Sequence, residues 1–264
     1  MTDSIDRDGV VSTTDLRVRL TRHEVLRGVD LQLGRGVHGV LGPNGAGKST
    51  LIRVLASTLR HDGGEVHVLG RSYAKAADVR WVRERLGYLP QSFGFHRSFT
   101  AREYVEYLAW LKRVPTRDIP AAADRALERV DMVGRAKTKM GRLSGGMLRR
   151  VGVAQAIVNE PDVLLLDEPT VGLDPEQRVG FRRLLRDVAT DACVIVSTHL
   201  VEDVTHACDS VTVLVDGLVA QRTDPAGLVA LGADAGADAT ADSDIERGYT
   251  AAVRSARTLL EERA

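Results

Sequence analysis

The segment GPNGAGKST, at residues 42–50, carries residue types that bind phosphate. It fits the pattern G-x-x-x-x-G-K-[ST] through Gly42, Gly47, Lys48 and Ser49. Glycines let backbone N–H groups turn onto an anion, and a following helix adds the positive end of its dipole. We expect Lys48 to reach the β- and γ-phosphates and the Ser49 hydroxyl to bind Mg²⁺. The predicted nucleotide-binding residues are Gly42, Pro43, Asn44, Gly45, Ala46, Gly47, Lys48, Ser49 and Thr50.

The sequence on either side supports this interpretation. The apolar run VHGVL predicts a buried strand before the glycines, and LIRVLASTLR predicts an amphipathic helix after them. That helix would place Leu51, Val54, Leu55 and Thr58 on one face. A flexible loop that only caps the helix is the alternative.

A second segment, VLLLDEP at 163–169, ends an apolar run in two carboxylates. The run predicts a strand buried on both faces, whose carboxyl end lies at the ligand crevice of an open α/β sheet. We expect Asp167 to hold Mg²⁺ through water and Glu168 to be the general base for an attacking water. Neighbouring strand residues point to opposite faces, so the two acids would take different roles. An ordinary strand end with solvated acids is the alternative.

Composition and charge exclude several classes of protein. The chain has 264 residues, 44% of them hydrophobic, which suits one α/β unit with a smaller appendage. Its 36 basic and 36 acidic residues give zero formal net charge, so no global field favours nucleic acid or anionic lipid. Apolar runs are too short to predict a transmembrane helix. The polar start MTDSIDRDGV is unlike a signal peptide. The two cysteines, Cys193 and Cys208, lie in no CxxC motif or histidine cluster, so we expect neither a disulfide nor a zinc site, and we expect a reducing compartment.

Strand and helix patterns alternate along most of the chain. Strand patterns fall at 14–20, 29–41, 64–70, 86–90, 162–167 and 192–198, and SVTVLVDG with LVAQR predicts a closing hairpin. Helical patterns fill residues 100–159, so we expect an α/β fold with a parallel sheet and an inserted helical subdomain. Residues 231–244, rich in Ala, Asp and Gly, predict a flexible linker. Residues 245–264 predict a helical tail, amphipathic through Ile245, Tyr249, Val253 and Leu259.

Five ordered motifs carry a family resemblance: GPNGAGKST, YLPQ, LSGG (from residue 143), LLLDEPTVGLDP and STH. In this order and spacing, the chain resembles the ATP-binding subunit of an ATP-binding cassette (ABC) transporter over residues 12–230. The resemblance implies a P-loop NTPase core with a mostly parallel sheet, an antiparallel β subdomain and a helical subdomain inserted at about 92–158. It also implies an ATPase that uses ATP and Mg²⁺. Two subunits, as a homodimer or as a heterodimer with another ABC ATPase subunit, would enclose two ATP molecules head to tail.

The resemblance assigns roles to further residues. Gln91 would sense Mg²⁺ and move the helical subdomain, and His199 would contact the γ-phosphate and position water. Ser144, Gly145 and Gly146 would bind the γ-phosphate of ATP held by the other subunit. Asp174 would lie in the loop that crosses the dimer interface. From the residues alone, Ser144 before its glycines and Asp174 before Pro175 each also read as a helix N-cap.

Two positions depart from the family pattern. Met147 stands where Gln is frequent, although exporters of drugs or lipids often carry Met there. Leu20, with His23 three residues on, stands where the family usually has an aromatic ring that stacks on adenine. Adenine stacking would therefore be weakened or replaced.

The family type implies a transport ATPase, peripheral at the cytoplasmic face of the membrane, that works with integral membrane permease subunits. The motif style resembles exporters of drugs, antibiotics or lipids, with no nucleic-acid partner. A soluble ABC ATPase acting on ribosomes or DNA is the alternative, but such proteins usually carry two cassettes or a coiled coil, and a basic patch. An inactive scaffold would lack Glu168 or His199. The helical region is rich in aromatic residues, which could form a groove for a permease helix or fill the core of the subdomain. We expect at least Tyr107 and Trp110 to lie in that core. The aromatic residues are Phe93, Phe95, Phe99, Tyr104, Tyr107 and Trp110.

Overall fold

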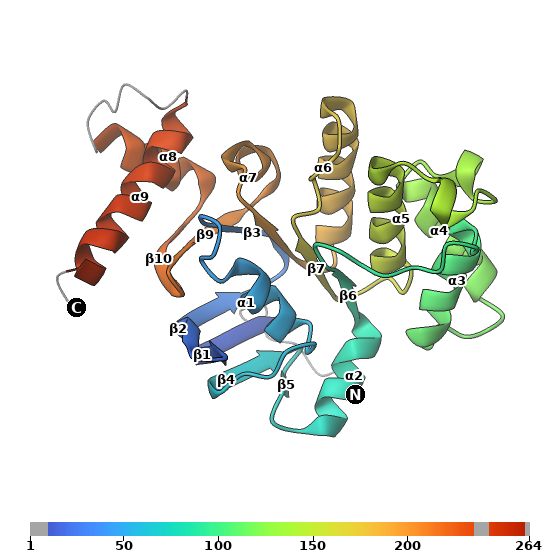
Figure 1. The fold of residues 1–264 in the computed structure, drawn as a ribbon, viewed down its shortest axis with the longest axis horizontal. Helices are drawn as coiled ribbons and strands as arrows, with labels where there is room; N and C mark the ends of the chain where they lie inside the picture. Colours follow the sequence, from blue (N-terminus) through green and yellow to red (C-terminus); the bar gives the residue numbers. More distant parts are fainter. Residues whose placement is uncertain (1–9, 235–242, 262–264) are drawn as a thin grey trace.

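Two β-sheets form the body of the molecule (Figure 1). The computed structural model of the protein describes residues 10–234 and 243–261. An antiparallel sheet has the order β2-β1-β4-β5, from β1 (Val11–Leu20), β2 (His23–Leu33), β4 (Gly63–Val68) and β5 (Arg71–Ser72). The second sheet has the order β10-β9-β3-β8-β7-β6, from β3 (Gly36–Leu41), β6 (Leu86–Leu89), β7 (Val163–Asp167), β8 (Cys193–Thr198), β9 (Ser210–Val215) and β10 (Leu218–Thr223). It is parallel except for β10, so the predicted fold class is confirmed.

The helices fall into groups around the second sheet. Helices α3 (Ala101–Leu111), α4 (Ile119–Arg129) and α5 (Gly145–Ile157), with short 3₁₀ turns at Val133–Arg135 and Met140–Arg142, form a block beside β6 (Figure 1). Helices α8 (Pro225–Asp234) and α9 (Asp244–Glu261) pack at the opposite end, against β9 and β10. The others are α1 (Lys48–Leu55), α2 (Ala76–Arg85), α6 (Pro175–Ala189) and α7 (Val201–Ala207).

The central strands are buried on both faces because their side chains supply two apolar clusters. Every residue of β7 and β8 is buried. Along β7, Leu164 and Leu166 join the cluster shared with the helical block, whereas Val163 and Leu165 join the cluster shared with α1 and the antiparallel sheet. This alternation is the two-residue period of a strand packed between two layers.

The strand register delivers the predicted site residues to one edge of the sheet. Leu41 of β3 pairs with Thr198 of β8, and Asp167 of β7 pairs with Ser197. On the other side of β7, Leu166 pairs with Leu89 of β6. The segments that follow these strands therefore leave the sheet together, as expected for the ligand-binding edge of a parallel sheet.

Two segment predictions are wrong in part. The single strand predicted over 29–41 is split, because the chain leaves the antiparallel sheet after β2 and enters the parallel sheet at Gly36, whose φ is +119°. The linker predicted over 231–244 overlaps α8, which continues to Asp234 because Leu231 packs against the apolar cluster under α9. Residues 1–9, 235–242 and 262–264 and the Leu259 side chain lie outside the described part of the chain.

The expectation that the subdomain core claims Tyr107 and Trp110 is also wrong. Helix α3 buries Ala101, Tyr104, Val105 and Ala109, at helical spacing. Tyr107 and Trp110 lie on the opposite face and are 46% and 59% exposed. The aromatic residues thus divide between a packed cluster around Tyr104 and an exposed pair.

Candidate active site

The phosphate loop, residues 42–50, is built on glycine geometry. Gly47 precedes α1 in the left-handed conformation, with φ of +103°. At Gly42, a Cβ atom would lie 2.2 Å from the carbonyl oxygen of Leu214, so the close approach of β9 requires glycine. Lys48 Nζ donates hydrogen bonds to the carbonyls of Gly42, at 2.7 Å, and Pro43, at 3.0 Å. The loop is thus folded around its own lysine at the start of a helix.

Ser49 and Asp167 meet at the edge of the sheet although they are far apart in the sequence. The Ser49 hydroxyl donates to Asp167 Oδ1 at 3.0 Å, and Ser197 donates to the same oxygen. Hydroxyl and carboxylate oxygens are the hard ligands that Mg²⁺ prefers. These residues fit the predicted magnesium ion, and Gln91 lies nearby through its bond to Glu168.

Glu168 lies between Gln91 and His199, two of the other predicted catalytic residues. Gln91 Nε2 donates to Glu168 Oε2 at 3.0 Å, and His199 Nδ1 lies 3.2 Å from Glu168 Oε1. The prediction that Glu168 continues the strand, with its side chain on the face opposite to that of Asp167, is wrong. Glu168 has left β7 with φ of +49°, and its N–H donates to the Ser197 carbonyl at 3.0 Å. A turn, rather than strand alternation, therefore separates its side chain from that of Asp167.

The phosphate loop, Gln91 and Glu168 line a cavity of about 350 Å³, a volume within the range of small-ligand sites. Burial lowers the pKa of Lys48, and the carboxylates of Glu168 and Asp167 act in the opposite direction. The lining residues are Val25, Asn44, Gly45, Ala46, Gly47, Lys48, Ser49, Thr50, Gln91 and Glu168. Of the described side chains on β1 and β2, Val25 lines the cavity, whereas Leu20 pairs with His23 at the turn between these strands.

We expect Leu20→Tyr to tighten ATP binding by up to about tenfold, which corresponds to ~1.4 kcal/mol and lies in the lower part of the range of about 1–3 kcal/mol for a ring stacked on a base. Isothermal titration with non-hydrolysable ATP on Glu168→Gln protein measures this without turnover. Unchanged affinity would mean that adenine does not lie against Leu20. His23→Ala is the matched test, since it weakens binding only if the imidazole covers the base.

Ser144 and Asp174 both cap helices, as their alternative interpretations predict. Ser144 Oγ accepts from Met147 N–H at 3.3 Å at the start of α5, and Asp174 Oδ1 accepts from Gln177 N–H at 2.8 Å at the start of α6. Ser144 and Asp174 are not among the described residues that line the phosphate-loop cavity, and Gly145 and Gly146 are not among them either. The chain therefore brings together Lys48, Gln91, Glu168 and their neighbours, but not the LSGG segment or Asp174.

Arg149 is a central residue that sequence reasoning missed. It lies on α5, is 8% exposed, and donates to the backbone on both sides of Glu168 and at Gln91. Its carbonyl partners are those of Pro90 at 2.9 Å, Gln91 at 3.0 Å, Pro169 at 3.2 Å, Glu168 at 2.6 Å, and Asp167. Burial lowers its pKa, and the nearby carboxylates oppose that shift. Arg149 thus ties the helical block to the two loops that carry the catalytic side chains.

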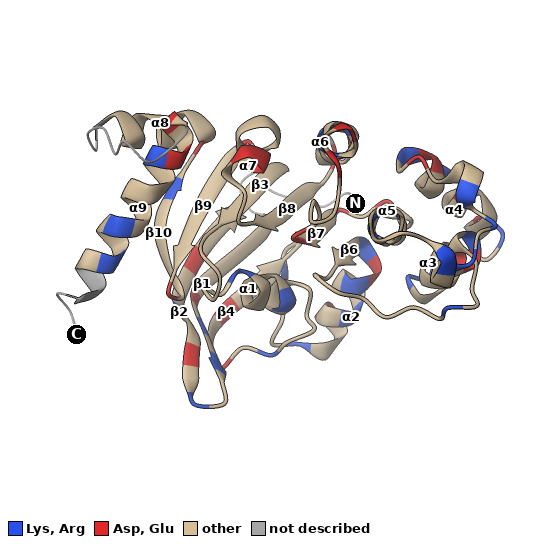
Figure 2. Cartoon of the chain, turned by 45° about the horizontal axis from the view of Figure 1, so that its top comes forward, with Lys and Arg blue, Asp and Glu red and all other residues tan. Residues whose placement is uncertain are grey.

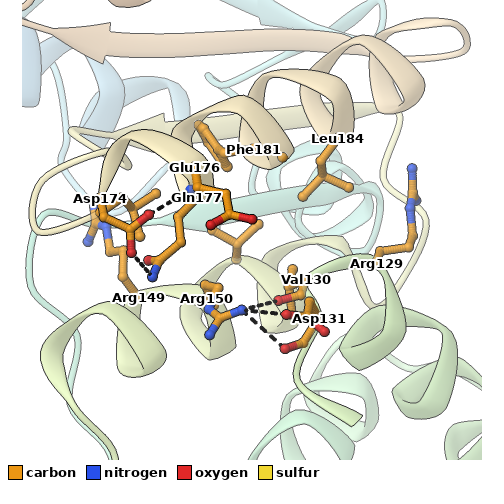
Figure 3. A pocket seen from close by; sticks show the side chains of 13 residues that line it. Arg129, Val130, Asp131, Arg149, Arg150, Asp174, Glu176, Gln177, Phe181 and Leu184 are labelled. Carbon is orange, nitrogen blue, oxygen red and sulfur yellow. Dashed lines mark hydrogen bonds and ion pairs between the residues drawn. The ribbon is translucent and has the colours of Figure 1, made fainter. Parts of the chain in front are cut away.

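A second cavity, of about 390 Å³, lies between α5 and α6 next to Arg149 (Figure 3). Arg150 borders it, but its guanidinium bonds to the Val130 carbonyl and to Asp131 on the side of α4 (Figure 3). The two neighbouring arginines therefore have different functions. Arg149 connects the helical block to the core, and Arg150 connects helices within the block.

Comparison with known proteins decides the family. The family model described as ABC transporter matches residues 26–171, more than half of the chain. The chain belongs to the ABC transporter family. This ABC protein is 37% identical over 214 residues to the daunorubicin resistance ATP-binding protein DrrA3 of Streptomyces coeruleorubidus, covering 80% of this chain and 67% of that one. It is 38% identical over 205 residues to the methionine import ATP-binding protein MetN of Bordetella avium, covering 76% of this chain and 57% of the relative.

Solved structures agree with the family assignment. The structure of cbiO1 from Clostridium perfringens, part of an ABC transporter complex, matches with a TM-score of 0.73 and 28% identity, covering 84% of this chain and 91% of that one. The chain spans 57–67% of the length of the two curated relatives above. ATP binding and hydrolysis are the activities of this family. Within the part of the ABC protein that the structure describes, no helix is long and apolar enough to cross a membrane.

Proposed function

We propose that this ABC ATPase closes head to tail around two ATP molecules and drives export through separate integral membrane permease subunits at the cytoplasmic face of the membrane. The proposal is carried by one observation: the phosphate-loop cavity is lined by Lys48, Ser49, Gln91 and Glu168 but not by the LSGG segment or Asp174. The LSGG segment and Asp174 cap helices elsewhere on the surface. A second subunit would supply them.

In this proposal, Glu168 takes the proton of the attacking water, and His199 holds Glu168 and the water in place. Lys48 exchanges its bonds to loop carbonyls for bonds to phosphate oxygens. Ser49, Asp167 and Gln91 would hold Mg²⁺, which supplies positive charge for phosphate oxygens. Phosphoryl transfer of this kind depends on positioning and charge stabilisation, so ordering of the groups around Glu168 is the main contribution of the protein.

Ser144→Arg is expected to leave ATP binding to one subunit intact and to block dimer closure, because Ser144 would serve a site on the other chain. Isothermal titration measures the first effect and light scattering with ATP measures the second. Mixing this variant with Lys48→Ala subunits restores at most one composite site in each heterodimer. A loss of ATP affinity beyond about tenfold, ~1.4 kcal/mol, in the isolated Ser144→Arg subunit would contradict a role in trans.

The helical block offers a surface for the permease. On α3, Tyr107, Trp110 and Leu111 are exposed apolar residues. The ring of Tyr107 stacks on that of Trp110 at 6.2 Å between centroids, and its other neighbour, Phe99, meets it edge-on at 6.1 Å. Clustered exposed aromatic residues are typical of partner sites, and an amphipathic cytoplasmic helix of the permease fits such a surface.

A photo-crosslinking residue at position 110 tests the permease proposal in cells. The expected product is a crosslink to a polytopic membrane protein. Position 133 is the matched control, since Val133 is a 61% exposed apolar residue of the same helical block. Crosslinks from position 110 to ribosomal protein or to DNA would favour the soluble alternative. Basic and acidic residues are interspersed over α3 and α4 (Figure 2), and this mixed charge favours a permease over a nucleic-acid partner.

The direction of transport is proposed from the relatives. DrrA3 is named for daunorubicin resistance, and Met147 occupies the position where exporters often carry methionine. MetN is named for import, so the comparison includes both directions. In inside-out membrane vesicles that contain the complex, export predicts ATP-dependent uptake of the cargo into the vesicle lumen.

A further inference from the structure

Helix α7 begins two residues after His199, so its position limits where the imidazole can lie. One side of α7 is anchored by hydrogen bonds. Asp203 Oδ2 accepts from Thr170 Oγ1 at 2.6 Å and from Thr198 Oγ1 at 3.5 Å. The Leu200 N–H donates to Thr198 Oγ1 at 3.0 Å. These bonds tie the start of α7 to the ends of β7 and β8.

The other side of α7 is covered by the C-terminal helices. Val201 and Val204 of α7 share a buried apolar cluster with Leu228 of α8 and Ile245 of α9. Helix α9 contacts α7, β9 and β10. Leu41, the last residue before the phosphate loop, belongs to the same cluster. The apolar face of α7 is therefore completed by side chains of α8 and α9.

The two C-terminal helices are fixed to each other by a close glycine crossing. At Gly248 of α9, a Cβ atom would lie 1.6 Å from the Leu228 carbonyl oxygen. At Gly232 of α8, it would lie 2.4 Å from the Asp244 carbonyl oxygen. Because α8 follows β10 after a single residue, this crossing sets the position of α9 against the sheet and α7 (Figure 1).

We propose that α9 positions the catalytic histidine, with Ile245 as the positioning residue. Ile245 packs in the cluster that holds Val201 and Val204, and α7 in turn holds His199 beside Glu168. This inference rests on the proposed role of His199 in hydrolysis. Removing the Ile245 side chain loosens α7 and lowers the fraction of time that His199 spends at Glu168, while α1, whose buried side chains belong to a different apolar cluster, keeps its geometry.

The test compares Ile245→Ala with Ser255→Ala, an exposed position on the same helix. We expect Ile245→Ala to lower kcat by about tenfold and to leave ATP affinity within about twofold, because the defect lies in positioning rather than binding. Amide hydrogen exchange is expected to become faster over 201–207 and to stay unchanged over 48–55. Ser255→Ala should match the unmodified chain in all three measurements.

Several outcomes would overturn the inference. These are unchanged exchange over 201–207, unchanged kcat despite faster exchange there, or equal loosening of 48–55 with loss of ATP affinity. Ile245→Val removes one methyl-sized group, so it keeps the test valid if the alanine variant does not fold. It should show the same effects at smaller size. His199→Ala with normal kcat would refute the proposed role of His199, whereas the exchange result would still report whether α9 holds α7.

Discussion

Glu168→Gln is expected to keep ATP binding and to lower turnover by about 10²- to 10⁴-fold, the contribution typical of a general base. The amide retains the shape of the side chain and can still meet Gln91 and His199, which contact its two oxygens in the native protein. Lys48, Ser49 and Asp167 are untouched, so the phosphate contacts remain. Steady-state phosphate release measures turnover, and isothermal titration with ATP measures binding.

Glu160→Gln is the control for this substitution. Its carboxylate is 68% exposed and pairs with Arg125 on the surface, so its removal should leave turnover unchanged. Turnover retained in Glu168→Gln would assign the base to another residue. Turnover and ATP binding lost together would mean that Glu168 supports the nucleotide site rather than the chemistry.

Arg149→Met is expected to destabilise the protein by at least about 1–3 kcal/mol, the cost typical of leaving a buried hydrogen-bond acceptor without its donor. The substitution keeps an apolar stem but leaves the carbonyls of Pro90, Gln91, Pro169, Asp167 and Glu168 without this donor. Turnover should fall as well, because these carbonyls belong to the loops that place Gln91 and Glu168. Denaturant unfolding measures stability, and phosphate release measures turnover.

Arg150→Met is the matched control, on the next residue of the same helix. The Arg150 side chain is 21% exposed and its carboxylate partner, Asp131, is fully exposed, so the expected loss is at most about 1 kcal/mol. Arg149→Lys should recover only part of the stability, because an ammonium group cannot span the positions that the guanidinium fork reaches. Equal effects of Arg149→Met and Arg150→Met would contradict the linking role of Arg149.

The sequence predicted the site residues whose chemistry depends on type and local spacing. Lys48 and Ser49 follow glycines, and Asp167 follows an apolar run, so each could be found from neighbouring residues alone. The alternation of strands and helices indicated a parallel sheet, and at one edge of that sheet the Ser49 hydroxyl donates to Asp167.

Features that depend on packing between distant segments could not be predicted. Arg149, in the run MLRRV, has the same local pattern as Arg150, and only the approach of α5 to the ends of β6 and β7 makes one of them buried. The left-handed turn at Glu168 depends on its bond to Ser197, from another strand. The exposure of Trp110 depends on which face of α3 the rest of the block covers.

The most direct test of the composite ATP site is the mass of the Glu168→Gln protein in solution, measured by multi-angle light scattering with ATP and Mg²⁺. Since the LSGG segment and Asp174 do not line the cavity of their own subunit, ATP that is bound but not hydrolysed should hold two subunits together. We expect a dimer with ATP, and a monomer without nucleotide or when the same chain also carries Ser144→Arg. A protein that stays monomeric while saturated with ATP would contradict the composite site.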